Sequence, residues 1–213
     1  MQTRAALAVR VAVPGTAALP PEPLRLSALD AQWVTFPLIQ RVFNFVDGAG
    51  DIPPFASAVD ALRESLAETA ARFPPLARRI VHRPATGDAA IDCAGAGSET
   101  MAAQVTRLRG RLVLGVAMHH AVADGRSVWR FLEAWAAACC GDADNDAEPP
   151  TSDRTAIRLP GGEELARAVL HKYAPDVPMA GGGEADEHVC SSAALCLTAF
   201  ATRLGKGRRW HWA

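Results

Sequence analysis

The sequence predicts an α/β fold in which strands and helices are layered around one core. Three features predict it: an alternating run near the start, a long amphipathic segment, and two strand-like runs that a second amphipathic segment follows. The 213 residues suffice for one domain or for part of a larger one. Hydrophobic residues make up 49% of them, which is enough to build a sizeable core.

The chain begins with a strand, a connector and a second apolar segment. In "ALAVRVAVPG" larger apolar residues alternate with alanine or arginine, which predicts a strand that ends at Pro14-Gly15; the alternating residues are Leu7, Val9, Val11 and Val13. The proline-rich "TAALPPEPLRLS" predicts an irregular connector. The mixture of aliphatic and aromatic residues in "FPLIQRVFNF" is typical of either a buried strand or a short helix.

The clearest helix runs from Phe55 to Phe73. Apolar residues recur there at intervals of three and four, which is the period of an α-helix with one buried face; they are Phe55, Val59, Leu62, Leu66, Ala70 and Phe73. Asp51 is placed to cap its start, Pro53 suits a first turn, and Pro74-Pro75 ends it. This helix is predicted to be scaffold without chemistry.

The segment "QVTRLRGRLVLGVAMHH" predicts a β-hairpin. Two strand-like runs flank Arg109-Gly110, where glycine supplies the backbone freedom of the turn. The second run, Leu112 to Met118, is almost wholly apolar and predicts a strand buried on both faces. After the turn at Asp124-Gly125, a second helix is predicted, with Ser127 as its cap and an apolar stripe of Val128, Phe131, Leu132 and Trp135.

The rest of the chain changes in character. The acidic segment "GDADNDAEPPTSD", residues 141–153, predicts a mobile linker. "PGGEELARAVLHKYAPDVPM" predicts a short helix that Pro175 and Pro178 close. Residues 180–213 begin with a glycine run, end basic and aromatic, and are expected to be an unrelated or disordered tail.

Composition excludes several classes of partner. The formal net charge is −1, so no global field attracts nucleic acid or an anionic membrane. Five cysteines without a CxxC pair favour neither a disulfide framework nor a zinc site. No signal peptide is evident, and no apolar run approaches the roughly 20 residues that span a bilayer. We therefore expect a cytoplasmic protein that binds no nucleic acid and no membrane.

Two adjacent histidines, His119 and His120, end the apolar strand, and Asp124 follows four residues after the second. Such histidines can simply be packed and hydrogen-bonded, or they can bind a metal, although no third ligand is evident. Imidazole is also the side chain best suited to remove a proton near neutral pH, provided that its orientation is fixed. The small residues Ala121, Val122 and Ala123 permit a tight turn, and Asp124 can anchor it.

Four segments, in order, resemble the plant BAHD acyl-CoA-dependent acyltransferases. "TRLRGRLVLGVAMHHAVADGRSVWRFLEAWA" resembles their HxxxD region, and "LRLSALDAQWVTFPLIQRVFNF" is similar to their start, especially in the branch that acylates anthocyanins and phenolic glycosides. "LARRIVHRPATGDAAIDC" and "PGGEELARAVLHKYAPDVPM" resemble a strand region and the stretch before their domain crossover. HHxxxDG also occurs in peptide-synthetase condensation domains and wax ester synthases, but the N-terminal match favours the BAHD family.

The resemblance implies a fold and a reaction. Residues 1–179 would form the N-terminal domain of a chloramphenicol-acetyltransferase-like two-domain fold, incomplete here. His120 would be the general base that deprotonates an acceptor hydroxyl or amine, which then attacks the thioester of an acyl-CoA, malonyl or hydroxycinnamoyl. The acceptor would be a phenolic or flavonoid glycoside, acylated at a hydroxyl. Asp124 would point away from substrate and hold the loop through an arginine, while His119 would be structural. Acyl-CoA is then a co-substrate, with no bound cofactor or metal, and the complete enzyme would be a monomer.

The chain also departs from this family. The second signature of these enzymes, Asp-Phe-Gly-Trp-Gly, is absent, and an internal deletion is expected near residues 94–103. The alternative function is therefore a catalytically inactive truncated relative, which would bind ligand weakly or pair with a partner.

Overall fold

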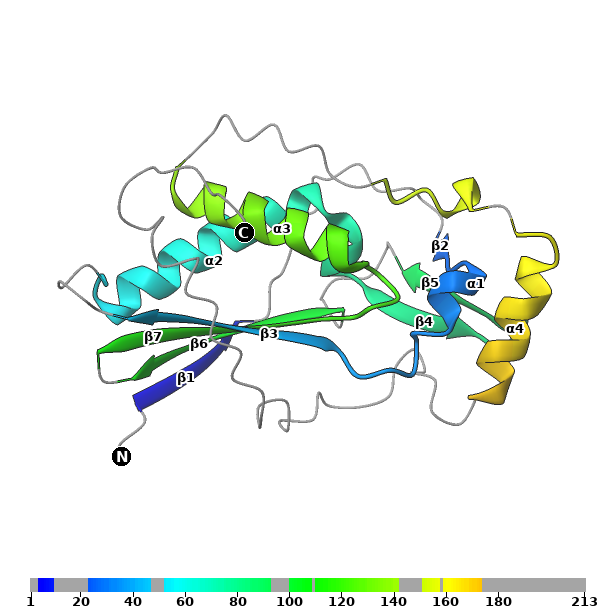
Figure 1. Cartoon of the computed structure of the whole chain (residues 1–213), viewed down its shortest axis with the longest axis horizontal. Helices are drawn as coiled ribbons and strands as arrows, with labels where there is room; N and C mark the ends of the chain where they lie inside the picture. Colours follow the sequence, from blue (N-terminus) through cyan, green and yellow to red (C-terminus); the bar gives the residue numbers. More distant parts are fainter. Residues whose placement is uncertain are drawn as a thin grey trace, which may run out of the picture.

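The strands form two antiparallel sheets in the computed structural model, which describes residues 4–9, 23–46, 52–92, 100–108, 110–141, 151–157 and 159–173. Helices α2 and α3 lie together on one face of the larger sheet, while α1 and α4 lie beside the smaller sheet at the other end (Figure 1). This arrangement is the layered α/β fold that the sequence predicts.

The larger sheet has four strands in the order β1-β6-β7-β3, with the bounds β1 Arg4–Val9, β6 Met101–Leu108, β7 Arg111–Met118 and β3 Ile39–Val46. The predicted hairpin is confirmed as β6 and β7, and Gly110 adopts the positive φ of 65° that its turn requires. The predicted N-terminal strand is confirmed as β1, although Val11 and Val13 lie outside the described residues. Of the two alternatives for "FPLIQRVFNF", the strand is correct.

Strand register decides which side chains enter the core. Phe43 pairs with Leu114, and Leu114 pairs with Val105, so these three side chains share the face beneath the helices, where all are buried. The prediction that Leu112–Met118 is buried on both faces is wrong for the first part of β7. Val113, whose side chain points to the other face, and Gly115 are only half-buried, because α2 and α3 cover one face of the sheet.

The long predicted helix is confirmed as α2, Phe55–Arg72. It begins after Pro54, which provides no side-chain cap, and the expected cap Asp51 lies outside the described residues. The helix ends at Arg72 with Phe73 as its C-cap, as the proline pair predicts, and a short 3-10 helix, η1 (Pro74–Ala77), follows.

Helix α3, Gly125–Cys139, packs against α2 through a fully buried aromatic side chain, Trp135. The indole N–H of Trp135 donates to the Ser65 hydroxyl at 3.1 Å and to the Leu62 carbonyl at 3.3 Å. One turn earlier, the ring of Phe131 meets the edge of Phe73 with a centroid distance of 5.4 Å. These contacts fix where α3 begins, and therefore where the loop from β7 must end.

The smaller sheet has the order β2-β5-β4, with β2 Leu24–Arg25, β5 Asp88–Asp92 and β4 Arg79–Arg83. The predicted C-terminal helix is confirmed as α4, Gly162–Lys172, and it contacts both β5 and α1, Ala28–Ala31. The buried Asp88 pairs with Arg25 and Arg167, both at 3.5 Å, which ties α4 to this sheet. Pro175 and Pro178 lie beyond the described residues.

Three predicted features lie wholly or mostly outside the described residues. They are the internal deletion near residues 94–103, the linker at 141–153 and the tail at 180–213. At the described edges, β6 begins at Met101, and Thr151–Asp153 lead into η2, Arg154–Ala156. No helix within the described ranges is both long and apolar enough to cross a membrane.

We expect Trp135→Phe to lower the free energy of unfolding by about 1–3 kcal/mol. The change removes the indole N–H that two acceptors use and leaves a small void in the core. Urea unfolding followed by circular dichroism measures it. The matched control is Trp129→Phe on the more exposed side of α3, which should cost less stability than Trp135→Phe because Trp129 is not part of the core. Equal stability of both variants would contradict the assigned role of Trp135.

Candidate active site at the end of strand β7

The two histidines lie in a short buried loop between β7 and α3. The backbone N–H of His119 donates to the Thr100 carbonyl at 2.7 Å, which extends the pairing of β6 with β7 by one residue. The N–H of Val122 then returns to the His119 carbonyl at 3.0 Å and closes a turn. The sequence predicts this tight turn from the small residues Ala121, Val122 and Ala123, and in the structure all three are also buried.

His119 is a buried structural residue with both ring nitrogens occupied. Its Nδ1 accepts from the Ala121 N–H at 3.2 Å, so Nε2 carries the proton and faces the Val34 carbonyl at 3.2 Å. Burial lowers the pKa of His119, and the neighbouring His120 lowers it further, against the opposing effect of the bond to Val34. A neutral imidazole with no free nitrogen is not available as a base.

His120 is half-buried and is held in a different way. Its ring lies flat on the indole of Trp33, with centroids 4.2 Å apart and an interplanar angle of 9°. Within the ranges that the structure describes, the ring makes no hydrogen bond to protein. The side chain is therefore fixed through its face, while the nitrogens at its edge have no protein partner there.

Asp124 is exposed and caps helix α3. Its carboxylate accepts from the Ser127 N–H at 2.7 Å, and hydrogen bonds from the hydroxyl and N–H of Ser127 hold the pKa of Asp124 below its usual value. The prediction that Ser127 is the cap is wrong: Asp124 is the N-cap, and Ser127 is the residue whose N–H it binds. Among the described side chains, no arginine forms an ion pair with Asp124.

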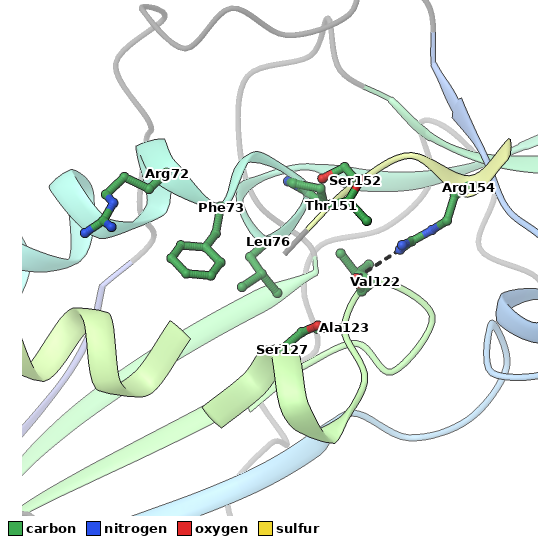
Figure 2. Close-up of a pocket in the computed structure, with 10 residues that line it drawn as sticks. Arg72, Phe73, Leu76, Val122, Ala123, Ser127, Thr151, Ser152 and Arg154 are labelled. Atoms are coloured by element: carbon green, nitrogen blue, oxygen red, sulfur yellow. Dashed lines mark hydrogen bonds between the residues drawn. The ribbon is translucent and has the colours of Figure 1, made fainter. Parts of the chain in front are cut away.

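An arginine does hold this loop, but through a different partner. Arg154 donates from Nη2 to the Val122 carbonyl at 3.1 Å, as the dashed line in Figure 2 marks. Its Nε lies 3.2 Å from Asp30 in α1, and both side chains are largely shielded from solvent. Arg154 therefore connects the histidine loop to the N-terminal part of the chain.

Sequence reasoning missed Asp30 and Arg154. The pattern Ser27-x-x-Asp30 carried a usable signal, because the two side chains form a reciprocal capping box at the start of α1. Arg154 carried none, since it stands just after the acidic linker and meets the loop only in the folded chain.

A small hollow lies beside the loop, between the end of α2, the start of α3 and the segment at Thr151–Arg154 (Figure 2). Its volume is about 40 Å³, room for a few water molecules, and His120 is not among the residues that line it. Across the described residues, no three His, Cys, Asp or Glu side chains gather as a metal ion would require.

Comparison with known proteins identifies relatives. A sequence model of the Transferase family matches residues 11–105 and 98–193. The chain is 30% identical to putrescine hydroxycinnamoyltransferase 2 of Oryza sativa subsp. japonica over 196 residues, covering 70% of this chain and 60% of that protein. It is 38% identical to BAHD acyltransferase DCR of Arabidopsis thaliana over 68 residues, covering 32% of this chain and 14% of that protein. Neither name supports the anthocyanin or malonyl branch.

The fold also has a solved counterpart. Vinorine synthase superimposes with a TM-score of 0.56 at 18% identity, over 73% of this chain and 46% of that one. This likeness confirms the chloramphenicol-acetyltransferase-like fold class, and the chain spans less than two thirds of the length of these relatives. Because the family model matches most of the sequence, the chain belongs to the BAHD transferase family.

Proposed function

We propose that this chain takes part in acyl transfer from a coenzyme A thioester to a hydroxyl or amine, with His120 as general base. The imidazole removes a proton from the acceptor, whose freed electron pair attacks the thioester carbonyl. The C–S bond then breaks, coenzyme A leaves as its thiolate, and the imidazolium of His120 returns the proton to that sulfur.

One observation carries the proposal: the two adjacent imidazoles differ in their hydrogen-bond partners. His119 has a protein partner at each nitrogen, whereas the His120 nitrogens have none in the described part of the chain. A base needs a fixed orientation together with an unoccupied nitrogen, and within the described part of the chain His120 has both.

Asp124 serves this site indirectly. By capping α3 it fixes the point where the helix starts, while Arg154 holds the Val122 carbonyl in the middle of the loop. We assign both residues the role of anchoring the loop, without contact to substrate.

We also propose which acyl donor and which acceptors this chain uses. A hydroxycinnamoyl thioester is preferred to malonyl, since the rice relative is named as a hydroxycinnamoyltransferase. For the acceptor, the sequence resemblance favours a phenolic or flavonoid glycoside, whereas the name of the rice relative offers putrescine, an amine. Putrescine is a cationic amine, whereas a phenolic glycoside is not a cation. An assay in which the two acceptors compete for the same acyl-CoA decides which one the chain prefers.

We further propose that residues 1–179 supply one wall of a channel whose other wall comes from a second domain. The assay therefore uses two proteins. The first is the chain as it is, and the second is a fusion in which the C-terminal part of the rice relative follows Met179 in place of residues 180–213. Thiol release is measured with coumaroyl-CoA or malonyl-CoA, and with putrescine or a flavonoid glucoside. Acceptor-dependent release by either form supports the function, and no release by both forms overturns it.

We expect His120→Ala to lower the rate of acyl transfer about 10²–10⁴-fold, because the base is lost. The free energy of unfolding should fall by no more than about 1.5 kcal/mol, since the half-buried ring loses its stack on Trp33. The matched control is His82→Ala, the same change in strand β4, which should keep the wild-type rate. Transfer by His120→Ala at the wild-type rate would exclude His120 as the base.

We expect Asp124→Ala to lower the free energy of unfolding by about 1 kcal/mol at pH 7, since the helix loses its cap. Asp124→Asn should cost less, because asparagine also caps. The lowered pKa of Asp124 means that its carboxylate stabilises the folded chain above about pH 4 and stops doing so as the pH falls through its folded-state pKa. The deficit of Asp124→Ala should therefore shrink on acidification.

Urea titrations of both Asp124 variants and the wild type at pH 7 and at lower pH measure this difference. An equal and large loss in Asp124→Ala and Asp124→Asn would contradict the capping role. It would instead favour the ion pair with an arginine that the family resemblance implies.

A further inference from the structure

We propose that Trp33 is the positioning residue of His120, and that its indole face sets the plane of the catalytic imidazole. The inference rests on the proposed function. The Trp33 and His120 rings are stacked, with centroids 4.2 Å apart and planes within 9° of parallel.

Stacking is a contact that orients a base without blocking it. A hydrogen-bonded imidazole is oriented at the expense of one nitrogen, as His119 illustrates. A ring that is held by its face keeps both in-plane nitrogens available, and Trp33 holds the His120 ring by its face. The indole face also favours a cation next to it, so it stabilises the imidazolium that forms when the base accepts a proton.

Trp33 can hold the ring because Trp33 is itself fixed. Its backbone N–H donates to the Asp30 carbonyl at 2.9 Å, in the turn that follows α1. The ring of Phe36 meets its indole edge-on, with centroids 5.2 Å apart. The next residue, Val34, is buried and presents its carbonyl to His119.

The turn that carries Trp33 is also tied to the loop that carries His120. Asp30 begins the link in α1, Arg154 pairs with it at 3.2 Å, and the same guanidinium donates to the Val122 carbonyl at 3.1 Å. Together with the bond between His119 and Val34, this link brings residues 30–36 and 119–122 into one unit. The position of Trp33 relative to His120 is therefore fixed by two sets of contacts, the Asp30–Arg154–Val122 link and the bond between His119 and Val34.

The first measurement is independent of catalysis. Nuclear magnetic resonance of the intact chain, with the His120 signals identified from their loss in His120→Ala, should show His120 ring protons shifted upfield by the indole ring current. Trp33→Leu should remove that shift, and Trp33→Phe, which keeps an aromatic face, should retain part of it. A His120 signal that is unchanged in Trp33→Leu overturns the proposal, whether or not the chain transfers acyl groups.

The second measurement separates positioning from substrate binding. In whichever form of the chain is active, Trp33→Leu should lower kcat roughly ten- to a hundredfold with little change in KM for the acyl-CoA, since a misoriented base affects the chemical step. Trp33→Phe should recover much of that loss. The matched control is Trp129→Leu, the same change on α3, which should keep the wild-type kcat.

The possible outcomes are distinct. If the ring-current shift is present and no form of the chain releases thiol, the proposed function fails while the stacked geometry stands. If thiol is released but Trp33→Leu keeps the wild-type kcat, or if Trp129→Leu lowers kcat equally, the positioning role of Trp33 fails. Should Trp33→Leu not fold, the partial shift and partial kcat expected of Trp33→Phe decide the question.

Discussion

The geometry of this site depends on the buried imidazole of His119. It is a neutral ring that donates to the Val34 carbonyl and accepts from the Ala121 N–H, so one side chain joins the turn after α1 to the end of β7. A charged imidazole at this position would cost free energy, because burial disfavours the charged form and lowers the pKa of His119. The neighbouring His120 lies at the rim of the core, half-buried, and its nitrogens have no hydrogen-bond partner among the described residues.

The scaffold around the loop works by covering one face of the larger sheet. Helices α2 and α3 cover that face, and the Trp135 bonds to Ser65 and Leu62 keep the two helices together. Since β7 ends beneath α3, its chain must turn sharply to enter the helix, and the small residues Ala121 and Ala123 are buried at that turn. The packing of the scaffold therefore also constrains the position of the His120 ring.

Much of the local structure could be predicted from periodicity and turn chemistry. Helix α2, the β6–β7 hairpin with Gly110, and α4 follow from patterns within one segment, because a stripe of apolar residues or a glycine at a turn acts locally. The burial of β7 on both faces was wrong, since an apolar run does not say whether a second layer covers it. The cap of α3 was misplaced by three residues because both aspartate and serine are good caps.

The sequence by itself determined the α/β class, the elements that carry the loop, and the choice of His120 and Asp124 as candidates. Only the tertiary structure decided how the two adjacent imidazoles differ, through contacts with residues more than 80 positions away in the chain: Val34 occupies His119, and Trp33 stacks on His120. It also decided that Arg154 holds the loop at the Val122 carbonyl, while Asp124 caps α3. Hydrogen bonds and stacking act over a few ångströms, so the partners of a side chain are known only once the fold has brought distant segments together.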